Sequence, residues 1–186
     1  YMIIHFDAGR EFSVKAIDAA MVNDGFIILI SQKDFAISTP EPSDLYDVGT
    51  IAKIRQVVKH GKSEYRIVVE GVSRAAVDGI ISTDPYYLCE ATEMGDIPVK
   101  EEDRGTARVY MEKIKQICRS GAFTPKEDDA AEALKTLDSI TDFALFSDVV
   151  AANVSSTLER KQAVLAEFDI VKRLKLLTDI MGDELE

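Results

Sequence analysis

The feature that most constrains the fold of this chain is a change in hydrophobic periodicity near Gly95. Before this point, apolar residues form short runs or alternate with polar ones, as in "EYRIVVEG" (64–71), which is the period of β-strands. After it, apolar residues recur at spacings of three and four, which is typical of amphipathic helices. A strand-rich half followed by a helix-rich half predicts the α+β class.

The first half predicts about six strands and one helix. The helix is expected over 13–24, with Ser13 as its cap and Gly25 as its stop. Because turn-forming residues separate the strands, we expect a small barrel or a strongly curved antiparallel sheet. The expected strands cover 1–6, 26–31, 48–58, 64–71, 73–81 and 86–94.

The second half begins with a charged segment, "GDIPVKEEDRG", and continues with roughly five helices. The charged segment predicts a connector with some hinge freedom. We therefore expect three parts: a β-rich subdomain over 1–94, a connector over 95–104 and an α-helical bundle over 105–186.

Three helices of the bundle carry start signals in the sequence. Thr124 followed by Pro125 predicts an N-cap and a first helical residue. Ser156 with Glu159 has the spacing of a capping box, and Asp169 is placed to cap the last helix.

The string Gly61-Lys62-Ser63 matches the end of a phosphate-binding loop. That loop requires G-x-x-x-x-G-K-[ST] between a strand and a helix, because the helix N-terminus and the free amides hold the phosphates. Position 56 is Gln instead of Gly, and the residues that follow the string have the period of a strand. The string therefore predicts the tip of a β-hairpin and no nucleotide site.

The chain shows no local signature of catalysis or of metal binding. His5 and His60 have no Cys or carboxylate at metal-ligand spacing, and G-x-S-x-G does not occur. Cys89 and Cys118 are far apart and are expected to be buried free thiols in a reducing compartment. We therefore expect no catalytic residue and no metal site in this chain.

The charge of the chain argues against two classes of partner. The formal net charge is −11, and both halves are acidic. Phosphate backbones and anionic membrane surfaces would be repelled, which disfavours nucleic-acid and membrane binding. No apolar run approaches the roughly 20 residues that cross a bilayer, and no signal peptide is visible, so we expect a cytoplasmic protein. Since "YMIIHF" at the start reads as the middle of a strand, we expect a piece of a longer protein.

Several separated stretches resemble the N-terminal domain of the Lon ATP-dependent proteases. They are "HFDAGREFSVKAIDAAM", "QKD", "DLYDVGTIAKIRQVVK" and "RIVVEGVSRA", followed by "KQAVLAEFDIVKRLKLL" in the helical half. The resemblance runs in order over nearly the whole chain. It implies a PUA-like β-barrel or curved antiparallel sheet with one helix, followed by an α-helical bundle.

The resemblance also implies a function. Such a domain is the non-catalytic part of an ATP-dependent serine protease; it binds unfolded, tagged or damaged proteins and aids assembly of a homo-oligomeric ring. The family's ATP-binding motifs and Ser–Lys dyad lie in later domains, so ATP and Mg are expected to bind outside this chain, which would be no enzyme. The family usually has a strand before the position of Tyr1, so one strand of the sheet is expected to be missing here.

Two other functions are compatible with the resemblance. The chain could be a stand-alone LON-domain binding protein, or a PUA-like RNA-binding module. Its acidity opposes the RNA-binding alternative.

A domain that recognises unfolded proteins needs an exposed apolar patch with a polar rim. Apolar residues of the Pro-rich loop and of a nearby strand end are the candidates for it, with local core packing as the alternative for each one. They are Phe35, Ile37, Leu45, Tyr46, Tyr86 and Tyr87. The last helix offers another apolar stripe, formed by Ile170, Leu174, Leu177 and Met181. It is bundle core, an interaction surface, or both, with its N-terminal part packed and its end free.

Overall fold

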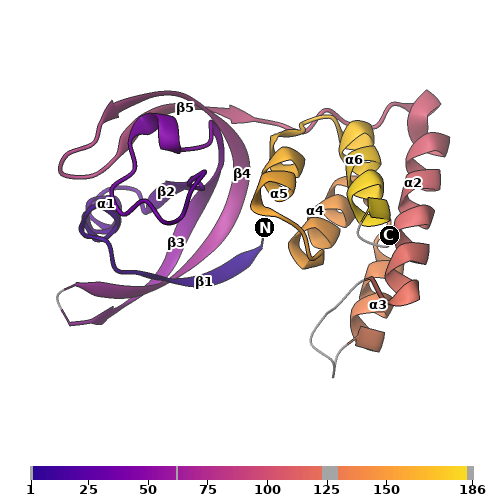
Figure 1. The fold of residues 1–186 in the computed structure, drawn as a ribbon, viewed down its shortest axis with the longest axis horizontal. Helices are drawn as coiled ribbons and strands as arrows, with labels where there is room; N and C mark the ends of the chain where they lie inside the picture. The colour runs from indigo at the N-terminus through magenta and orange to yellow at the C-terminus, as the bar shows by residue number, and fades with distance from the viewer. Residues whose placement is uncertain (1, 62, 123–129, 184–186) are drawn as a thin grey trace. The chain divides into compact units, whose positions relative to one another are not determined.

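The structure, a computed structural model, describes residues 2–61, 63–122 and 130–183. Contacts between residues divide the chain into two units, Tyr1–Gly95 and Asp96–Glu186 (Figure 1). The strands described lie in the first unit, and the second unit is helical. Each unit has its own cluster of buried apolar residues.

The first unit is built on one antiparallel sheet. Its strands are β1 (Ile3–Ala8), β2 (Phe26–Leu29), β3 (Val48–His60), β4 (Glu64–Ser82) and β5 (Leu88–Met94). The order is β1-β4-β3-β2, and β5 also pairs with β4, beyond the part that β1 covers. Figure 1 shows the curvature of β3 and β4. In the described part of the chain β1 and β2 do not pair with each other, so the sheet is curved and open, not a closed barrel.

The prediction of two strands over 64–71 and 73–81 was wrong, because β4 runs through both. Its pairing with β3 shifts register there: Ile51 lies opposite Ser73, and Ala52 lies opposite Gly71. Val72 is thus the extra residue of a β-bulge, which bends a strand without ending it.

Helix α1 (Glu11–Met21) covers one face of the sheet. Val14, Ile17 and Ala20, each three residues after the one before, lie in a core with Ile67 and Val69 of β4.

Both ends of α1 differ from the prediction, because the helix begins at Glu11 and ends at Met21, not at residue 24. Arg10 is the N-cap residue and provides no side-chain cap, while Ser13 lies inside the first turn. Gly25 adopts φ 76, the left-handed conformation that follows the end of a helix.

The predicted β-hairpin at Gly61 is confirmed. His60 of β3 pairs with Glu64 of β4, and Gly61 takes φ 74, which a turn of this kind requires. Lys62 lies outside the described residues. No helix follows the turn, so the arrangement that holds a phosphate is not formed here.

The second unit contains α2 (Arg104–Ile117), α3 (Ala130–Ser139), α4 (Phe143–Asn153), α5 (Leu158–Ala166) and α6 (Ile170–Asp183). A 3₁₀ turn (Glu101–Asp103) precedes α2, and a π-helical turn (Cys118–Ala122) follows it. Helix α6 contacts α2, α4 and α5 and supplies much of the core.

Two of the predicted helix caps can be compared with the structure. Thr157, not Ser156, caps α5, and its hydroxyl accepts from the Arg160 N–H at 3.2 Å. Asp169 caps α6 as predicted, accepting from the Lys172 N–H at 3.1 Å. The cap predicted at Thr124 and Pro125 lies outside the described residues.

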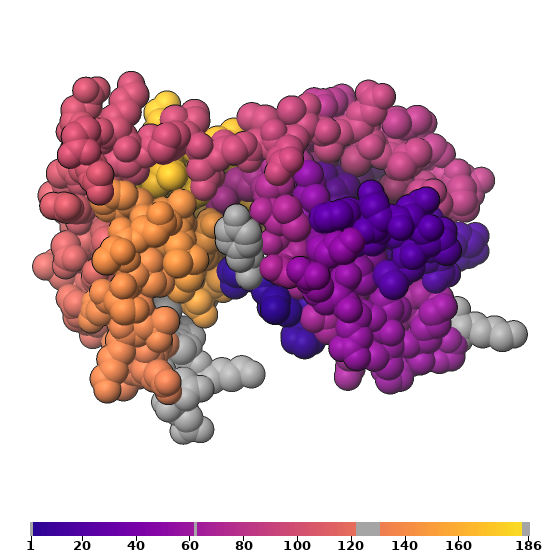
Figure 2. Space-filling view, turned by 180° about the vertical axis from the view of Figure 1, so that it is seen from behind, coloured from indigo at the N-terminus to yellow at the C-terminus, as the bar shows by residue number. Residues whose placement is uncertain are grey.

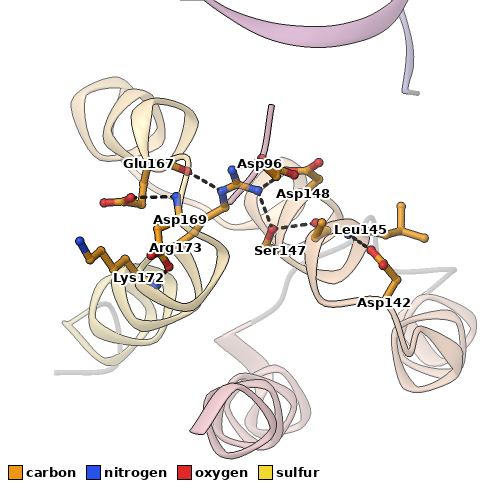
Figure 3. A network of polar contacts seen from close by, with 10 residues as sticks. Asp96, Asp142, Leu145, Ser147, Asp148, Glu167, Asp169, Lys172 and Arg173 are labelled. Carbon is orange, nitrogen blue, oxygen red and sulfur yellow. Dashed lines mark hydrogen bonds and ion pairs between the residues drawn. The ribbon is translucent and has the colours of Figure 1, made fainter. Parts of the chain in front are cut away.

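The first residues after Gly95, expected to belong to a connector, are bonded to the helical unit. The Ile97 N–H donates to the Phe168 carbonyl at 2.8 Å, and the Ile97 carbonyl accepts from the Ile170 N–H at 3.2 Å. Asp96 accepts from the buried guanidinium of Arg173 at 2.5 Å (Figure 3).

Candidate functional site

The loop between β2 and β3, residues 31–47, is closed at its base by backbone pairing. The Tyr46 N–H donates to the Ser31 carbonyl at 3.1 Å, and the Lys33 N–H donates to the Asp44 carbonyl at 2.8 Å. A β-bridge also joins Gln32 to Leu45. These contacts hold the two ends of the loop together, so its outer part is presented from a fixed base.

The second half of the loop is fixed by a short 3₁₀ turn, Pro42–Asp44. Glu41 and Asp44 cap this turn reciprocally, and the Glu41 N–H donates to the Asp44 carboxylate at 2.7 Å. Such a capping box satisfies backbone N–H groups that the turn leaves free.

Two aromatic residues attach the loop to the rest of the unit. The Tyr87 hydroxyl donates to the Pro40 carbonyl, and Pro40 is a buried residue. The Tyr87 ring meets Phe12 of α1 edge to face, with 4.9 Å between the ring centroids. The loop is therefore tied both to α1 and to the segment that precedes β5.

The first half of the loop contains a β-turn that exposes an aromatic side chain. The Ile37 N–H donates to the Asp34 carbonyl at 3.3 Å, which leaves Phe35 and Ala36 as the central residues. The Asp34 carboxylate accepts from the Ala36 N–H at 2.9 Å, a contact that favours Asp at the first position. Phe35 is 86% exposed, the largest exposed fraction among the large apolar residues described.

The side chain of Gln32 bridges the ends of this turn. Its Nε2 donates to the carbonyl oxygens of Ile37, at 2.9 Å, and Asp34, at 3.2 Å. Its Oε1 accepts from the guanidinium of Arg10, the N-cap residue of α1. Sequence analysis missed both residues, because no motif marks an amide that acts through its neighbours.

The structure places the six candidate residues in two groups. Phe35 is exposed. The other five are half-buried: Ile37, Leu45, Tyr46, Tyr86 and Tyr87. Of these, Ile37 accepts a hydrogen bond from the Gln32 side chain, and Leu45 forms a β-bridge with Gln32. The Tyr87 hydroxyl donates to the Pro40 carbonyl. Figure 2 shows that α1 and the segments after it, indigo to violet, reach the surface of this unit.

The charged side chains of the loop bond to its own backbone. Lys33 turns its ammonium back to the Ser43 carbonyl at 3.1 Å, and the carboxylates of Asp34, Glu41 and Asp44 accept from backbone N–H groups of the loop. Phe35 is thus a single exposed apolar side chain on a loop whose charged side chains bond to the loop's own backbone.

Neither cysteine has the environment of a nucleophile. Burial raises the pKa of the Cys118 thiol to about 11. Burial and the nearby charge of Asp78 raise the pKa of Cys89 as well. Raised pKa values keep both thiols protonated near neutral pH, and a protonated thiol is a poor nucleophile.

The described ranges 2–61, 63–122 and 130–183 contain no group of three His, Cys, Asp or Glu residues that could hold a metal ion. Within the same ranges, no helix has both the length and the apolar character needed to cross a membrane.

The apolar stripe of the last helix is bundle core and not a free surface. Ile170, Leu174, Leu177 and Met181 are at most 6% exposed and pack in the cluster of the helical unit. The alternative that the stripe forms an interaction surface was wrong for these four residues.

Comparison with known proteins gives a consistent assignment. A family model described as "ATP-dependent protease La (LON) substrate-binding domain" matches residues 1–183. A Lon protease from Clostridioides difficile (strain 630) is 35% identical over 192 residues, which cover all of this chain and 24% of that protein. A Lon protease from Clostridium acetobutylicum is 35% identical over 189 residues, with the same coverage. The chain thus spans about a quarter of the length of these relatives.

Solved structures share the fold. The N-terminal domain of a Mycobacterium avium complex Lon protease has a TM-score of 0.75 and 22% identity, covering 98% of this chain and 90% of that one. A Lon N-terminal domain protein from Xanthomonas campestris has a TM-score of 0.62 and 12% identity, covering 96% and 89%.

Proposed function

Because the chain belongs to the family of Lon substrate-binding domains, we propose that it binds unfolded segments of other proteins at the loop of residues 31–47. Phe35 is the main contact in this proposal. The observation that carries it is an aromatic ring, 86% exposed, on a turn held by several hydrogen bonds.

The exposure of Phe35 has a free-energy cost that a partner can remove. Burying a Phe side chain contributes about 2 kcal/mol, which corresponds to roughly a thirtyfold change in affinity. Because the turn is already fixed, little backbone freedom is lost when a partner binds. A partner would therefore gain most of that contribution.

The shape of the site favours an unfolded partner over a folded one. A protruding ring is buried only if the partner surrounds it. An unfolded chain can wrap around the ring and offers exposed apolar side chains of its own. Folded proteins rarely expose apolar patches larger than a few hundred Å².

Affinity measurements with one substitution test this proposal. The probe is reduced lysozyme with its cysteines carbamidomethylated, an unfolded polypeptide whose basic character avoids repulsion by the net charge of −11. Phe35→Ser should weaken binding roughly thirtyfold in fluorescence anisotropy, since the buried aromatic area is lost. The matched control is Val22→Ser, because Val22 is 83% exposed in the same unit and lies outside the loop.

A Phe35→Ser variant that binds as tightly as the wild type would contradict the proposal that the polypeptide binds at the loop of residues 31–47. A Val22→Ser variant that loses as much affinity as Phe35→Ser would show that the probe adheres to any exposed apolar residue.

We further propose that the longer protein is a cytoplasmic ATP-dependent serine protease that assembles as a ring of identical chains and degrades damaged or unfolded proteins. The support is that the relatives are Lon proteases and that this chain covers 24% of their length. ATP and Mg²⁺ would bind elsewhere in that protein, because the residues around Gly61 form a β-hairpin, which does not fit a nucleotide. Sequencing the gene beyond residue 186 tests this: a G-x-x-x-x-G-K-[ST] motif supports it, and a gene without one contradicts it.

A further inference from the structure

The turn that carries Phe35 is connected to α1 through one amide. Gln32 has one acceptor and two donors on its side chain, and the structure uses both kinds of group. The acceptor faces Arg10, and the Nε2 group faces the carbonyls of Asp34 and Ile37, which flank Phe35.

The orientation of this amide is determined by Arg10. A guanidinium has donors only, so Oε1 of Gln32 must face it and Nε2 must face the carbonyls. Arg10 is itself fixed: its carbonyl accepts from the Val14 N–H at 3.0 Å in the first turn of α1, and its guanidinium lies 5.9 Å from the centroid of the Phe12 ring.

From this geometry we infer that Gln32 and Arg10 are positioning residues of the binding surface. Resting on the proposed function above, the inference is that Gln32 holds the turn in the conformation that presents Phe35, and that Arg10 holds Gln32. Neither residue needs to touch the bound polypeptide. Without them, the β-turn retains only the contacts of Asp34, and binding must then order the turn at a cost in affinity.

The decisive variant is Gln32→Glu, which keeps the shape of the side chain and the contact with Arg10. It replaces Nε2 by an acceptor that faces two carbonyl oxygens, so both hydrogen bonds to the turn are lost. Affinity for the carbamidomethylated lysozyme probe should fall roughly fivefold to tenfold, because two hydrogen bonds that order the turn are lost while the Asp34 contacts still hold it in part.

A double-mutant cycle separates positioning from a general structural effect. In the Phe35→Ser background, Gln32→Glu should cause no further loss of affinity, because there is no aromatic ring left to present. An amide hydrogen-exchange measurement should show faster exchange at Ile37 in Gln32→Glu, while protection in the strands β3 and β4 stays at the wild-type level.

If Gln32→Glu fails to fold, Arg10→Met provides a second test, because it removes the hydrogen bond that orients the Gln32 amide. It leaves the Gln32 amide in place but free to turn, so the expected loss of affinity is smaller, roughly threefold. If Phe35→Ser weakens binding and neither Gln32→Glu nor Arg10→Met does, the positioning role is overturned and the proposed function stands. If Phe35→Ser itself has no effect, the proposed function fails first.

Discussion

At the scale of single residues, Gly49 determines how closely two strands of the sheet approach each other. It lies in β3 in "DVGT", where nothing in the sequence requires a glycine. In the structure a Cβ at this position would lie 2.5 Å from the Leu29 carbonyl oxygen of β2. The glycine therefore permits β2 to approach β3 at the base of the 31–47 loop.

We predict that Gly49→Ala destabilises the β-rich unit by about 2 kcal/mol, because the clash is with backbone, which cannot rotate away. Gly79→Ala is the matched control, since Gly79 lies in β4 and a Cβ there would meet nothing within 4 Å. Denaturant unfolding measures both. Equal stability of the two variants would contradict the close approach of β2 to β3.

Gln32 marks the limit of sequence reasoning about the site. The sequence predicted an apolar loop with Phe35 in it, because prolines and turn formers identify a loop and aromatic residues stand out. The hydrogen bond from Arg10 to Gln32 joins two residues that are 22 positions apart, and it depends on where α1 begins. Since α1 begins after Arg10 and not at Ser13, local patterns could not place that guanidinium beside the loop.

At the scale of secondary-structure elements, periodicity predicted strands and helices well, while local turn and cap residues predicted their ends only in part. The alternation of Tyr65, Ile67 and Val69 with Arg66, Val68 and Glu70 predicted a strand, and the first three are all buried in β4. By contrast, the break predicted between 64–71 and 73–81 is a β-bulge at Val72, next to Gly71. A glycine permits several backbone conformations, and only pairing with β3 selects one of them.

Helix α6 contains a contact that its sequence pattern did not indicate. Arg173 is fully buried within an apolar stripe, where it donates to the Glu167 carbonyl at 2.8 Å and to Asp96 at 2.5 Å (Figure 3). Asp148 lies 3.8 Å away, and the Ser147 hydroxyl lies 3.4 Å away. One side chain thus joins α6 to α4 and to the segment after β5.

We predict that Arg173→Met destabilises the helical unit by about 3 kcal/mol, because several partners lose their donor at once. The value lies at the low end for a buried ion pair, since Asp96 and Asp148 are 28% and 38% exposed and water can reach them. Lys175→Met is the control on the same helix; Lys175 pairs with Asp179 at the surface and its loss should have no measurable effect. Thermal unfolding that ranks the two variants equally would contradict the role of Arg173.

At the scale of the whole molecule, the chain has two cores that do not share a residue. The change in periodicity near Gly95 predicted this division, because strands and helices bury their apolar residues at different spacings. The open form of the sheet was harder to predict. A series of strands separated by turns is compatible with both a barrel and a curved open sheet. The pairing of β1 and β5 along the same edge of β4 decides between the two.

The central claim is that an unfolded polypeptide binds the β-rich unit at the loop of residues 31–47. Hydrogen exchange of the whole chain, with and without the carbamidomethylated lysozyme probe, tests it most directly. We predict new protection of the backbone amides at Phe35, Ala36 and Ile37, with no change in α6, whose apolar stripe is already buried. Protection that appears elsewhere and leaves residues 31–47 unchanged would contradict the claim.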